Sequence, residues 1–236
     1  MIIAGPCSFV TLSDKKQIIE TANALKKLIT HFRVKIYLGG TRADRYYEGV
    51  GKKGLHTLSY IQDNIMPVGT EIQIPQHVAE CSELNYLWVG ARSSRNYALL
   101  QSLCTLYKGE IMLKRGMDMT IQETIDLYDL IVGRYNRYPY IIERGTVNID
   151  RDQESRWSPD LKGVIRIKNE RPDIFDRLVI DCSHSVGRKE YVRDTYKAFK
   201  AIDCKHYMFE ATIDGKSLTD QRQMLSVKEL EEIICK

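Results

Sequence analysis

The chain has 236 residues, of which 43% are hydrophobic and 28% are charged, and its formal net charge is +4. These values are ordinary for one globular domain, and the length is enough to bury a sizeable core. The mild charge gives no case for general binding to nucleic acid or to membranes, and no apolar run is long enough to span a bilayer. Six cysteines occur without a CxxC pair, and no signal peptide precedes the first apolar run, so we expect free thiols and a cytoplasmic protein.

Short apolar runs rich in β-branched residues recur eight times, and segments with helical periodicity lie between them. The expected strands are Ile2–Pro6, Arg33–Leu38, Pro67–Ile72, Leu87–Gly90, Glu110–Lys114, Tyr140–Glu143, Leu178–Asp181 and His206–Glu210. This alternation predicts an α/β fold, a single (β/α)8 TIM barrel over residues 1–236. An open doubly wound sheet is the alternative, and the lack of a GxGxxG motif after an early strand disfavours it.

Four of the intervening segments have clear helical periodicity. They are Ser13–Ile29, Thr120–Val132, Val186–Ile202 and Val227–Ile234. Ser13 is the expected N-cap of the first helix, and Thr120 with Glu123 is an expected capping box. The second and sixth connections are less regular, so we expect them to consist mainly of loops.

Basic residues stand at the ends of three successive predicted strands, as Arg92, Lys114 and Arg144. A parallel barrel gathers its strand ends at one face, so these side chains are expected to meet there. Half-buried arginine and lysine need an anionic partner, and they suit phosphate and carboxylate oxygens. The alternative is ion pairing with acidic residues of the same barrel. Those residues are Glu71, Glu143 and Asp181.

Four residues at or just past the ends of distant strands form a candidate metal site. They are Cys7, His184, Glu210 and Asp220. A thiolate, an imidazole and two carboxylates suit a borderline divalent ion such as Mn2+, Fe2+, Co2+ or Zn2+. No local ligand spacing supports this group, so the alternative is that the cysteine packs in the core and the histidine is a hydrogen-bonded core residue.

Several segments resemble, in order, the motifs of class I 3-deoxy-D-arabino-heptulosonate-7-phosphate (DAHP) synthases. Ile3–Ser8 resembles the opening strand motif, and Asp181–Arg188 is similar to the Asp-Pro-Ser-His-Ala-Thr-Gly-Arg segment. Further matching segments are Val89–Arg92, Leu113–Met117, Glu143–Gly145, Phe209–Glu210 and Leu218–Asp220. The related 3-deoxy-manno-octulosonate-8-phosphate synthases share the barrel, but their motifs fit less well.

The resemblance implies a reaction in which phosphoenolpyruvate condenses with a phosphorylated aldose such as erythrose 4-phosphate. The products would be a 3-deoxy-2-ketoacid phosphate and inorganic phosphate. It further implies that the four metal candidates hold a divalent ion (Mn, Fe, Co or Zn). A place in the shikimate pathway and a homodimer or homotetramer are implied in the same way.

The resemblance also assigns roles to individual side chains. Arg92, Lys114 and Arg144 would bind the phosphate and carboxylate of phosphoenolpyruvate. The implied catalytic residues are Lys114, His184 and Arg42. Further candidates for substrate binding are Arg42, Lys35 and Arg188.

One departure from the family pattern follows the second strand. The family has Lys-Pro-Arg-Thr there, whereas this chain has Gly40–Asp44, with Gly40 at the lysine position. Arg42 keeps the arginine, and Arg45 is a second candidate for that role. Three lysines are candidates to replace the missing one. They are Lys35, Lys52 and Lys53.

A second departure lies near the end, where Glu-Val-His-Pro of the family becomes Glu210–Ile213 and a histidine is lost. The acceptor half of the site therefore departs more than the phosphoenolpyruvate half. A shifted acceptor, a catalytically silent phosphate-binding barrel and a metal-dependent ketoacid aldolase or lyase are the alternatives. We expect no added regulatory domain, and hence no response to aromatic amino acids.

Overall fold

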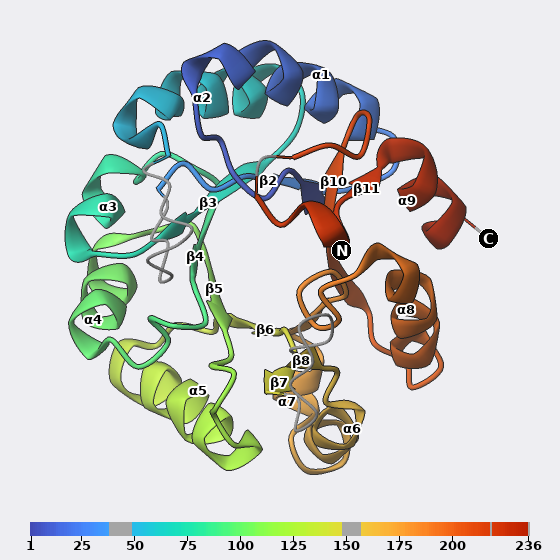
Figure 1. The fold of residues 1–236 in the computed structure, drawn as a ribbon. Helices are drawn as coiled ribbons and strands as arrows, with labels where there is room; N and C mark the ends of the chain where they lie inside the picture. Colours follow the sequence, from blue (N-terminus) through green and yellow to red (C-terminus); the bar gives the residue numbers. More distant parts are fainter. Residues whose placement is uncertain (38–48, 148–156, 218, 236) are drawn as a thin grey trace.

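A computed structural model describes residues 1–37, 49–147, 157–217 and 219–235. Eight parallel strands close into a barrel in the order β1, β2, β3, β4, β5, β6, β9 and β10, with β10 paired to β1. Figure 1 looks along the barrel, with the helices as an outer ring and the red β10 beside the first, blue strand. The prediction of a single (β/α)8 TIM barrel is confirmed.

The barrel strands are short and almost wholly buried, as expected where helices cover a parallel sheet. They are β1 (Ile2–Gly5), β2 (His31–Arg33), β3 (Val68–Ile72), β4 (Tyr86–Val89), β5 (Glu110–Lys114), β6 (Tyr140–Glu143), β9 (Leu178–Asp181) and β10 (His206–Thr212). An antiparallel hairpin of β7 (Thr146–Val147) and β8 (Trp157–Ser158) follows β6. The short strand β11 (Leu225–Ser226) extends the sheet beside β10.

The second strand begins and ends earlier than predicted. β2 pairs through Phe32 with both Ala4 and Val68, and its ladder ends at Arg33. Beyond that point a single bridge joins Lys35 to Ser8. Val34 and Ile36 in the run after Arg33 are buried, but the run makes only scattered backbone hydrogen bonds and no continuous ladder. A sequence pattern reports burial rather than pairing. The other seven predicted strands agree with the structure to within two residues at each end.

Nine described helices lie outside the strands. They are α1 (Lys15–Leu25), α2 (Leu55–Asn64), α3 (Pro75–Glu80), α4 (Tyr97–Leu106), α5 (Ile121–Tyr135), α6 (Leu161–Glu170), α7 (Pro172–Phe175), α8 (Val192–Lys200) and α9 (Val227–Ile234). Four 3-10 turns precede helices or strands. They are η1 (Leu12–Asp14), η2 (Gly51–Gly54), η3 (Lys189–Tyr191) and η4 (Gln221–Gln223).

The helix starts confirm one predicted cap and correct another. The Thr120 hydroxyl accepts from the Glu123 backbone N–H at 3.1 Å, and the Glu123 carboxylate accepts from the Thr120 N–H at 2.8 Å. Ser13 does not cap the first helix, because η1 precedes it and the Thr11 N–H donates to Asp14 instead. The capping box lies entirely within the local sequence, which explains why it was predictable.

Two connections expected to consist mainly of loops contain helices. α2 fills part of the second connection and buries Leu58 and Ile61, and α6 and α7 fill part of the sixth. α8 starts later than the predicted Val186, because Gly187 has φ of +68° and the chain turns there before η3. Tertiary packing therefore made helices where the apolar spacing alone was weak.

The core has two layers. Inside the barrel, Trp88, Met112, Ile142 and Met208 pack with neighbours from other strands, and a larger apolar layer lies between strands and helices. Side chains therefore fill the barrel interior, so a ligand can bind only at an end. None of the described helices is both long and apolar enough to cross a membrane.

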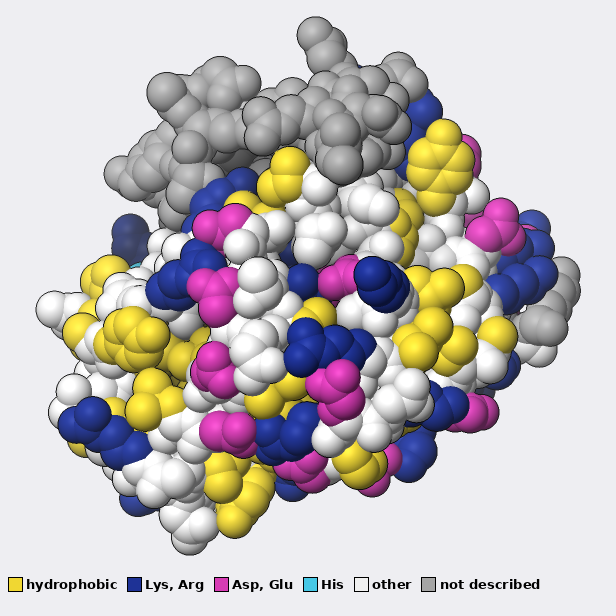
Figure 2. Space-filling model, turned by 90° about the horizontal axis from the view of Figure 1, so that it is seen from below, with side chains coloured by type: hydrophobic (Ala, Val, Ile, Leu, Met, Phe, Trp, Pro, Cys, Tyr) yellow, Lys and Arg dark blue, Asp and Glu magenta, His cyan; other side chains and the backbone are white. Residues whose placement is uncertain are grey.

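The face of the molecule below α5 and α6 in Figure 1 carries charges of both signs. Figure 2 shows acidic and basic side chains interspersed there, with small apolar patches between them. Ion pairs also occur on and between the neighbouring helices α5, α6 and α7: Arg171 pairs with Asp129 and Asp173, and Arg166 pairs with Glu170. Charges of one sign therefore do not dominate this face.

Candidate active site

The four predicted metal ligands lie together at the carboxyl ends of the strands. Cys7, His184, Glu210 and Asp220 each offer one ligand atom, and these atoms all lie within 4.8 Å of one another. The Cys7 thiol donates to Asp220 Oδ2 at 3.0 Å, and His184 Nε2 lies 3.3 Å from Glu210 Oε1. The pairing of β1 with β10 creates this proximity, because it places the Cys7 loop beside Glu210.

The donor atoms suit a borderline divalent ion such as Mn2+, Fe2+, Co2+ or Zn2+. Glu210 Oε1 is buried 3.3 Å from both His184 Nε2 and Arg33 Nη2, but it has no hydrogen-bond partner among the described residues, which suits an oxygen that would bind a cation. Burial and the nearby Glu210 charge raise the pKa of the Cys7 thiol, so a cation would have to displace its proton. Burial opposes ionisation of Asp220, but the charges of Lys35 and His184 lower its pKa to about 2.

Asp181 supports this group from behind. Its Oδ2 atom lies 2.9 Å from His184 Nδ1 and 2.7 Å from Lys114 Nζ, and the residue is fully buried at the end of β9. A carboxylate facing one imidazole nitrogen fixes the ring so that the other nitrogen faces the ligand group. Burial opposes the charge, yet His184 and Lys114 together hold the pKa of Asp181 well below its ordinary value.

A cavity of about 190 Å³ opens beside the ligand group, and cationic residues dominate its charged lining. Lys114 and Arg144 are buried at the ends of β5 and β6, and Arg92 is exposed in the loop after β4. The lining residues are Lys35, Glu71, Gln73, Gly90, Ala91, Arg92, Ser93, Lys114, Met117, Arg144 and His184. His184 thus belongs both to the ligand group and to the cavity wall.

The cations of the cavity differ in their internal partners. Lys114 is paired with Asp181, so the ion-pair alternative holds for this residue. Glu143 pairs with Arg115 instead of with a cation of the cavity. Arg115 Nη1 lies 2.8 Å from Glu143 Oε2 and 2.6 Å from Asp160 Oδ2. Arg144 Nη1 is buried with no hydrogen-bond partner among the described residues, and burial lowers the pKa of Arg144. An anion in the cavity would satisfy this unpaired guanidinium.

Two further charged residues belong to the site: Glu71, which the sequence suggested only as an ion-pair partner for the cations, and Arg33, which was not predicted. Glu71 accepts from Trp88 Nε1 at 2.9 Å, and although burial opposes its charge, Lys35 and Lys114 lower its pKa. A Cβ atom at Gly90 would lie 2.5 Å from Glu71 Oε1, so glycine leaves room for this carboxylate. Arg33 is fully buried beneath the ligand group, 3.3 Å from Glu210 Oε1. The available signal was a charged residue inside a strand predicted to be buried.

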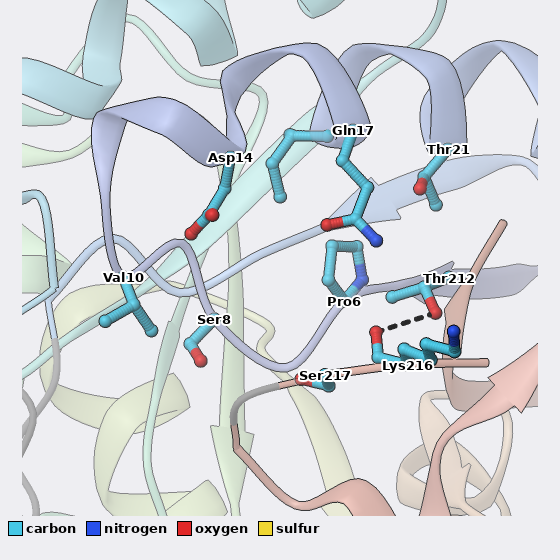
Figure 3. Close-up of a pocket in the computed structure, with 10 residues that line it drawn as sticks. Pro6, Ser8, Val10, Asp14, Gln17, Thr21, Thr212, Lys216 and Ser217 are labelled. Atoms are coloured by element: carbon cyan, nitrogen blue, oxygen red, sulfur yellow. Dashed lines mark hydrogen bonds between the residues drawn. The ribbon is translucent and has the colours of Figure 1, made fainter. Parts of the chain in front are cut away.

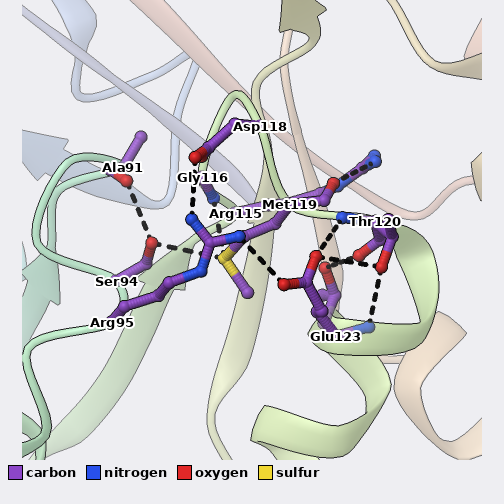
Figure 4. Close-up of polar contacts among 10 residues, drawn as sticks. Ala91, Ser94, Arg95, Arg115, Gly116, Asp118, Met119, Thr120 and Glu123 are labelled. Atoms are coloured by element: carbon purple, nitrogen blue, oxygen red, sulfur yellow. Dashed lines mark hydrogen bonds and ion pairs between the residues drawn. The ribbon is translucent and has the colours of Figure 1, made fainter.

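Loops on one side of the cavity are joined by polar contacts (Figure 4). Arg95 binds Asp118 at 2.8 Å and Glu123 at 3.0 Å, so it links the loop after β4 to the start of α5. The Ser94 hydroxyl contacts Met119 Sδ at 3.3 Å. These contacts hold the two loops that contribute Arg92 and Met117 to the cavity.

Comparisons with known proteins place the chain in a family. The model of the DAHP synthetase I family matches residues 1–236. The chain belongs to the DAHP synthetase I family. A solved DAHP synthase from Thermotoga maritima is 28% identical with a TM-score of 0.88, and the match covers 100% of this chain and 66% of that one. A truncated form of that bacterium's 3-deoxy-D-arabino-heptulosonate 7-phosphate synthase is 27% identical with a TM-score of 0.85, covering 100% and 84%. Among curated proteins, none matched the chain.

The DAHP synthetase I family has a lysine at the position that Gly40 occupies in this chain. Gly40 lies outside the described residues, as do Arg42 and Arg45. Of the three candidate substitutes, Lys35 lines the cavity, whereas Lys52 and Lys53 are exposed in η2. Burial opposes the Lys35 charge, but Cys7 and Glu71 raise its pKa. Lys35 is therefore a cation within reach of both the cavity and the ligand group.

The lost histidine of the family motif corresponds to Thr212 in β10. Its hydroxyl donates to the Lys216 carbonyl at 3.1 Å, and the side chain faces a separate hollow of about 40 Å³ between α1 and the loop after β10 (Figure 3). That hollow has room for a few water molecules only, so the larger cavity is the candidate substrate site. Arg188 is half-buried ahead of η3 and is not one of the described residues that line the larger cavity.

Proposed function

We propose that this chain catalyses the metal-dependent condensation of phosphoenolpyruvate with a phosphorylated aldose, erythrose 4-phosphate or a related aldehyde. The products would be a 3-deoxy-2-ketoacid phosphate and inorganic phosphate. The observation that carries the proposal is the shared position of His184. A cation-ligand group and a cavity dominated by lysine and arginine meet at this one residue. The similarity of the chain to two solved DAHP synthases supports the same reaction.

The residues divide the work between binding and chemistry. Arg92, Lys114 and Arg144 would bind the phosphate and carboxylate of phosphoenolpyruvate and orient its C3 carbon. Cys7, His184, Glu210 and Asp220 would hold the divalent ion. When bound, that ion supplies a Lewis acid for the aldehyde carbonyl.

Glu71 and Lys35 would accept and donate the protons of the reaction. Attack of C3 on the aldehyde leaves C2 electrophilic, and water adds there before the phosphate departs. Glu71 and Lys35 lie in the cavity wall, where a carboxylate can accept a proton from water and an ammonium can donate one to the forming alkoxide. Lys114 and Arg144 would stabilise the charge that moves to the leaving phosphate. We assign to Lys35 the role of the family lysine that Gly40 lacks.

The second candidate function is a catalytically silent barrel that binds phosphoenolpyruvate or a similar phosphate. One observation favours it, namely that the Thr212 hydroxyl donates to the Lys216 carbonyl beside the smaller hollow. The remaining alternative, a metal-dependent ketoacid aldolase or lyase, would use the same cavity. A cytoplasmic location stays a prediction from the sequence, and a homodimeric or homotetrameric assembly stays a prediction from the family resemblance.

The deciding experiment measures phosphate release from phosphoenolpyruvate with Mn2+ and a panel of four- and five-carbon aldose phosphates. We expect release with at least one aldose, and loss of release with a chelator or in Lys114→Met. Lys108→Met, which replaces an exposed lysine just before β5, serves as the control and should keep full activity. Binding of phosphoenolpyruvate without any release would favour the silent barrel. Absence of both binding and release would reject the proposal.

A further inference from the structure

The hairpin after β6 is held tightly against the barrel mouth. β7 and β8 pair Thr146 with Ser158 and Val147 with Trp157, and the Val147 N–H donates to the Met117 carbonyl at 3.3 Å. Gly145, just before the hairpin, has φ of +81°, and a Cβ atom there would lie 2.8 Å from the Ser158 carbonyl oxygen. The hairpin is therefore fixed to the loop that contributes Met117 to the cavity.

This attachment places an aromatic ring over an arginine of the cavity. The Arg144 guanidinium carbon lies 4.3 Å from the centroid of the Trp157 ring. On the side of the loop after β9, a Cβ atom at Gly187 would lie 3.9 Å from Trp157 Cδ1, so the indole also borders that loop. The position of Trp157 in the connection after β6 suggested that it lies near the barrel mouth, but its contact with Arg144 could not be predicted, because that contact depends on the hairpin geometry.

Two buried arginines near the strand ends show what the ring contributes. Arg115 is 4% exposed in its side chain and is neutralised by Glu143 and Asp160. Arg144 is similarly buried, at 6%, but Trp157 covers its face and its Nη1 atom has no hydrogen-bond partner among the described residues. A ring attracts the guanidinium from above without using the N–H groups at its edge. Arg144 therefore keeps its Nη1 donor for a ligand, whereas Nε, Nη1 and Nη2 of Arg115 already donate to Met119, Glu143 and Asp160.

We propose that Trp157 is a positioning residue that stacks on Arg144 and holds the guanidinium edge toward a phosphate or carboxylate group in the cavity. The inference rests on the proposed function in taking phosphoenolpyruvate as the natural anion. Trp157 does not touch the reacting atoms in this arrangement. It fixes the orientation of Arg144 before the ligand binds, so less side-chain conformational entropy is lost on binding.

The first test compares anion affinity in Trp157→Leu, Trp157→Phe and the control Val147→Ala, which lies across the hairpin from Trp157. Calorimetry with phosphoenolpyruvate and with inorganic phosphate should show affinity reduced roughly three- to tenfold in Trp157→Leu, a range that corresponds to one cation–π contact. Trp157→Phe should lose less, and Val147→Ala should bind as the unchanged protein does. Where turnover is measured, the Trp157→Leu effect should fall on KM and leave kcat nearly unchanged.

A double-mutant cycle separates positioning from general damage to the hairpin. In an Arg144→Lys background the planar guanidinium is gone, so Trp157→Leu should produce little further loss. Equal losses in both backgrounds, or an equal loss in Val147→Ala, would overturn the inference. Tryptophan emission gives an independent readout, since the chain has only two tryptophans. Phosphoenolpyruvate should change the emission of the unchanged protein and have much less effect in Trp157→Phe.

The outcomes distinguish this inference from the function on which it rests. Normal phosphoenolpyruvate binding with no effect of Trp157 replacement would reject the positioning role and leave the proposed reaction standing. Weakened anion binding in Trp157→Leu without phosphate release in any variant would support the stack and reject the reaction. Failure of the unchanged protein to bind either anion would overturn both.

Discussion

The anion side and the acceptor side of the barrel mouth differ in how their polar groups are held. On the anion side, Lys114 and Arg144 stand at the ends of β5 and β6, and polar contacts of Arg95 fix the neighbouring loops. On the acceptor side, Thr212 ends β10, and its hydroxyl donates to the Lys216 carbonyl in the loop that follows. Strand ends can therefore keep a binding function while the loops beyond them change, as is general for barrel enzymes.

The largest effect is expected where the two sides meet, at the cation-ligand group. Cys7→Ala removes the only sulfur of the group and should reduce affinity for Mn2+ or Zn2+ at least about 100-fold, with phosphate release falling in proportion. Metal content after dialysis measures this loss. Cys104→Ala, another buried cysteine outside the site, should retain metal. Unchanged metal content in Cys7→Ala would mean that these four residues are not the ligands.

Replacement of Lys35 tests whether this lysine takes the role of the family lysine that is absent at Gly40. Lys35→Met should lower the rate of phosphate release by about 100-fold or more, because a positioned proton donor typically contributes that much. Lys52→Met, which removes an exposed lysine of η2, is the matched control. If Lys52→Met lowers the rate and Lys35→Met does not, then Lys52 takes the role of the missing family lysine. Our comparison of the two sides would then be wrong.

The acid sensitivity of the metal-free protein should depend on Asp220. Its folded pKa of about 2 lies below the unfolded value of about 3.9, so its ionised form adds stability above about pH 4. That contribution is lost as pH falls from about 4 to about 2. Asp220→Asn should therefore flatten the pH dependence of the free energy of unfolding in this window, as measured by urea titration with a chelator present. The exposed Asp63→Asn should leave the slope unchanged, and an unaltered slope in Asp220→Asn would contradict the assigned contacts.

The smallest effect concerns the support of the anion side. Thr120→Ala removes the N-cap of α5 and should reduce the free energy of unfolding by about 1 kcal/mol. Affinity for phosphoenolpyruvate should hardly change, because Arg95 still joins Asp118 and Glu123. Thr105→Ala, within the exposed part of α4, is the control for loss of a threonine. A large loss of affinity in Thr120→Ala would show that this side is less rigid than its contacts indicate.

Sequence predicted those features that depend on local order or on strand ends. The Thr120–Glu123 cap is local, and Cys7 could be placed near Glu210 once a closed parallel barrel was assumed. The ligand roles of the four residues remain a prediction, although the structure brings them within 4.8 Å. The predictions of α5 and of most strands are confirmed, because their apolar residues repeat with a regular period.

Other features depend on partners distant in the chain. Trp88 and Lys35 explain the buried charge of Glu71, and Glu210 explains that of Arg33; each of these partners is distant in sequence from the residue it contacts. The end of β2 is set by the ladders on either side of it, not by its own apolar run. Trp157 reaches Arg144 only through the hairpin. Such contacts carry no periodic signal, so a single sequence could not reveal them.

The bond between Cys7 and Asp220 joins positions 213 residues apart. During synthesis the Cys7 thiol is made long before the Asp220 carboxylate, so a nascent chain cannot assemble the full set of donors until Asp220 has been added. Metal capture would thus follow the synthesis of the last barrel strand, β10. Because the unfolded chain lacks the assembled set, a captured ion would favour the closed barrel over every partly built form of it.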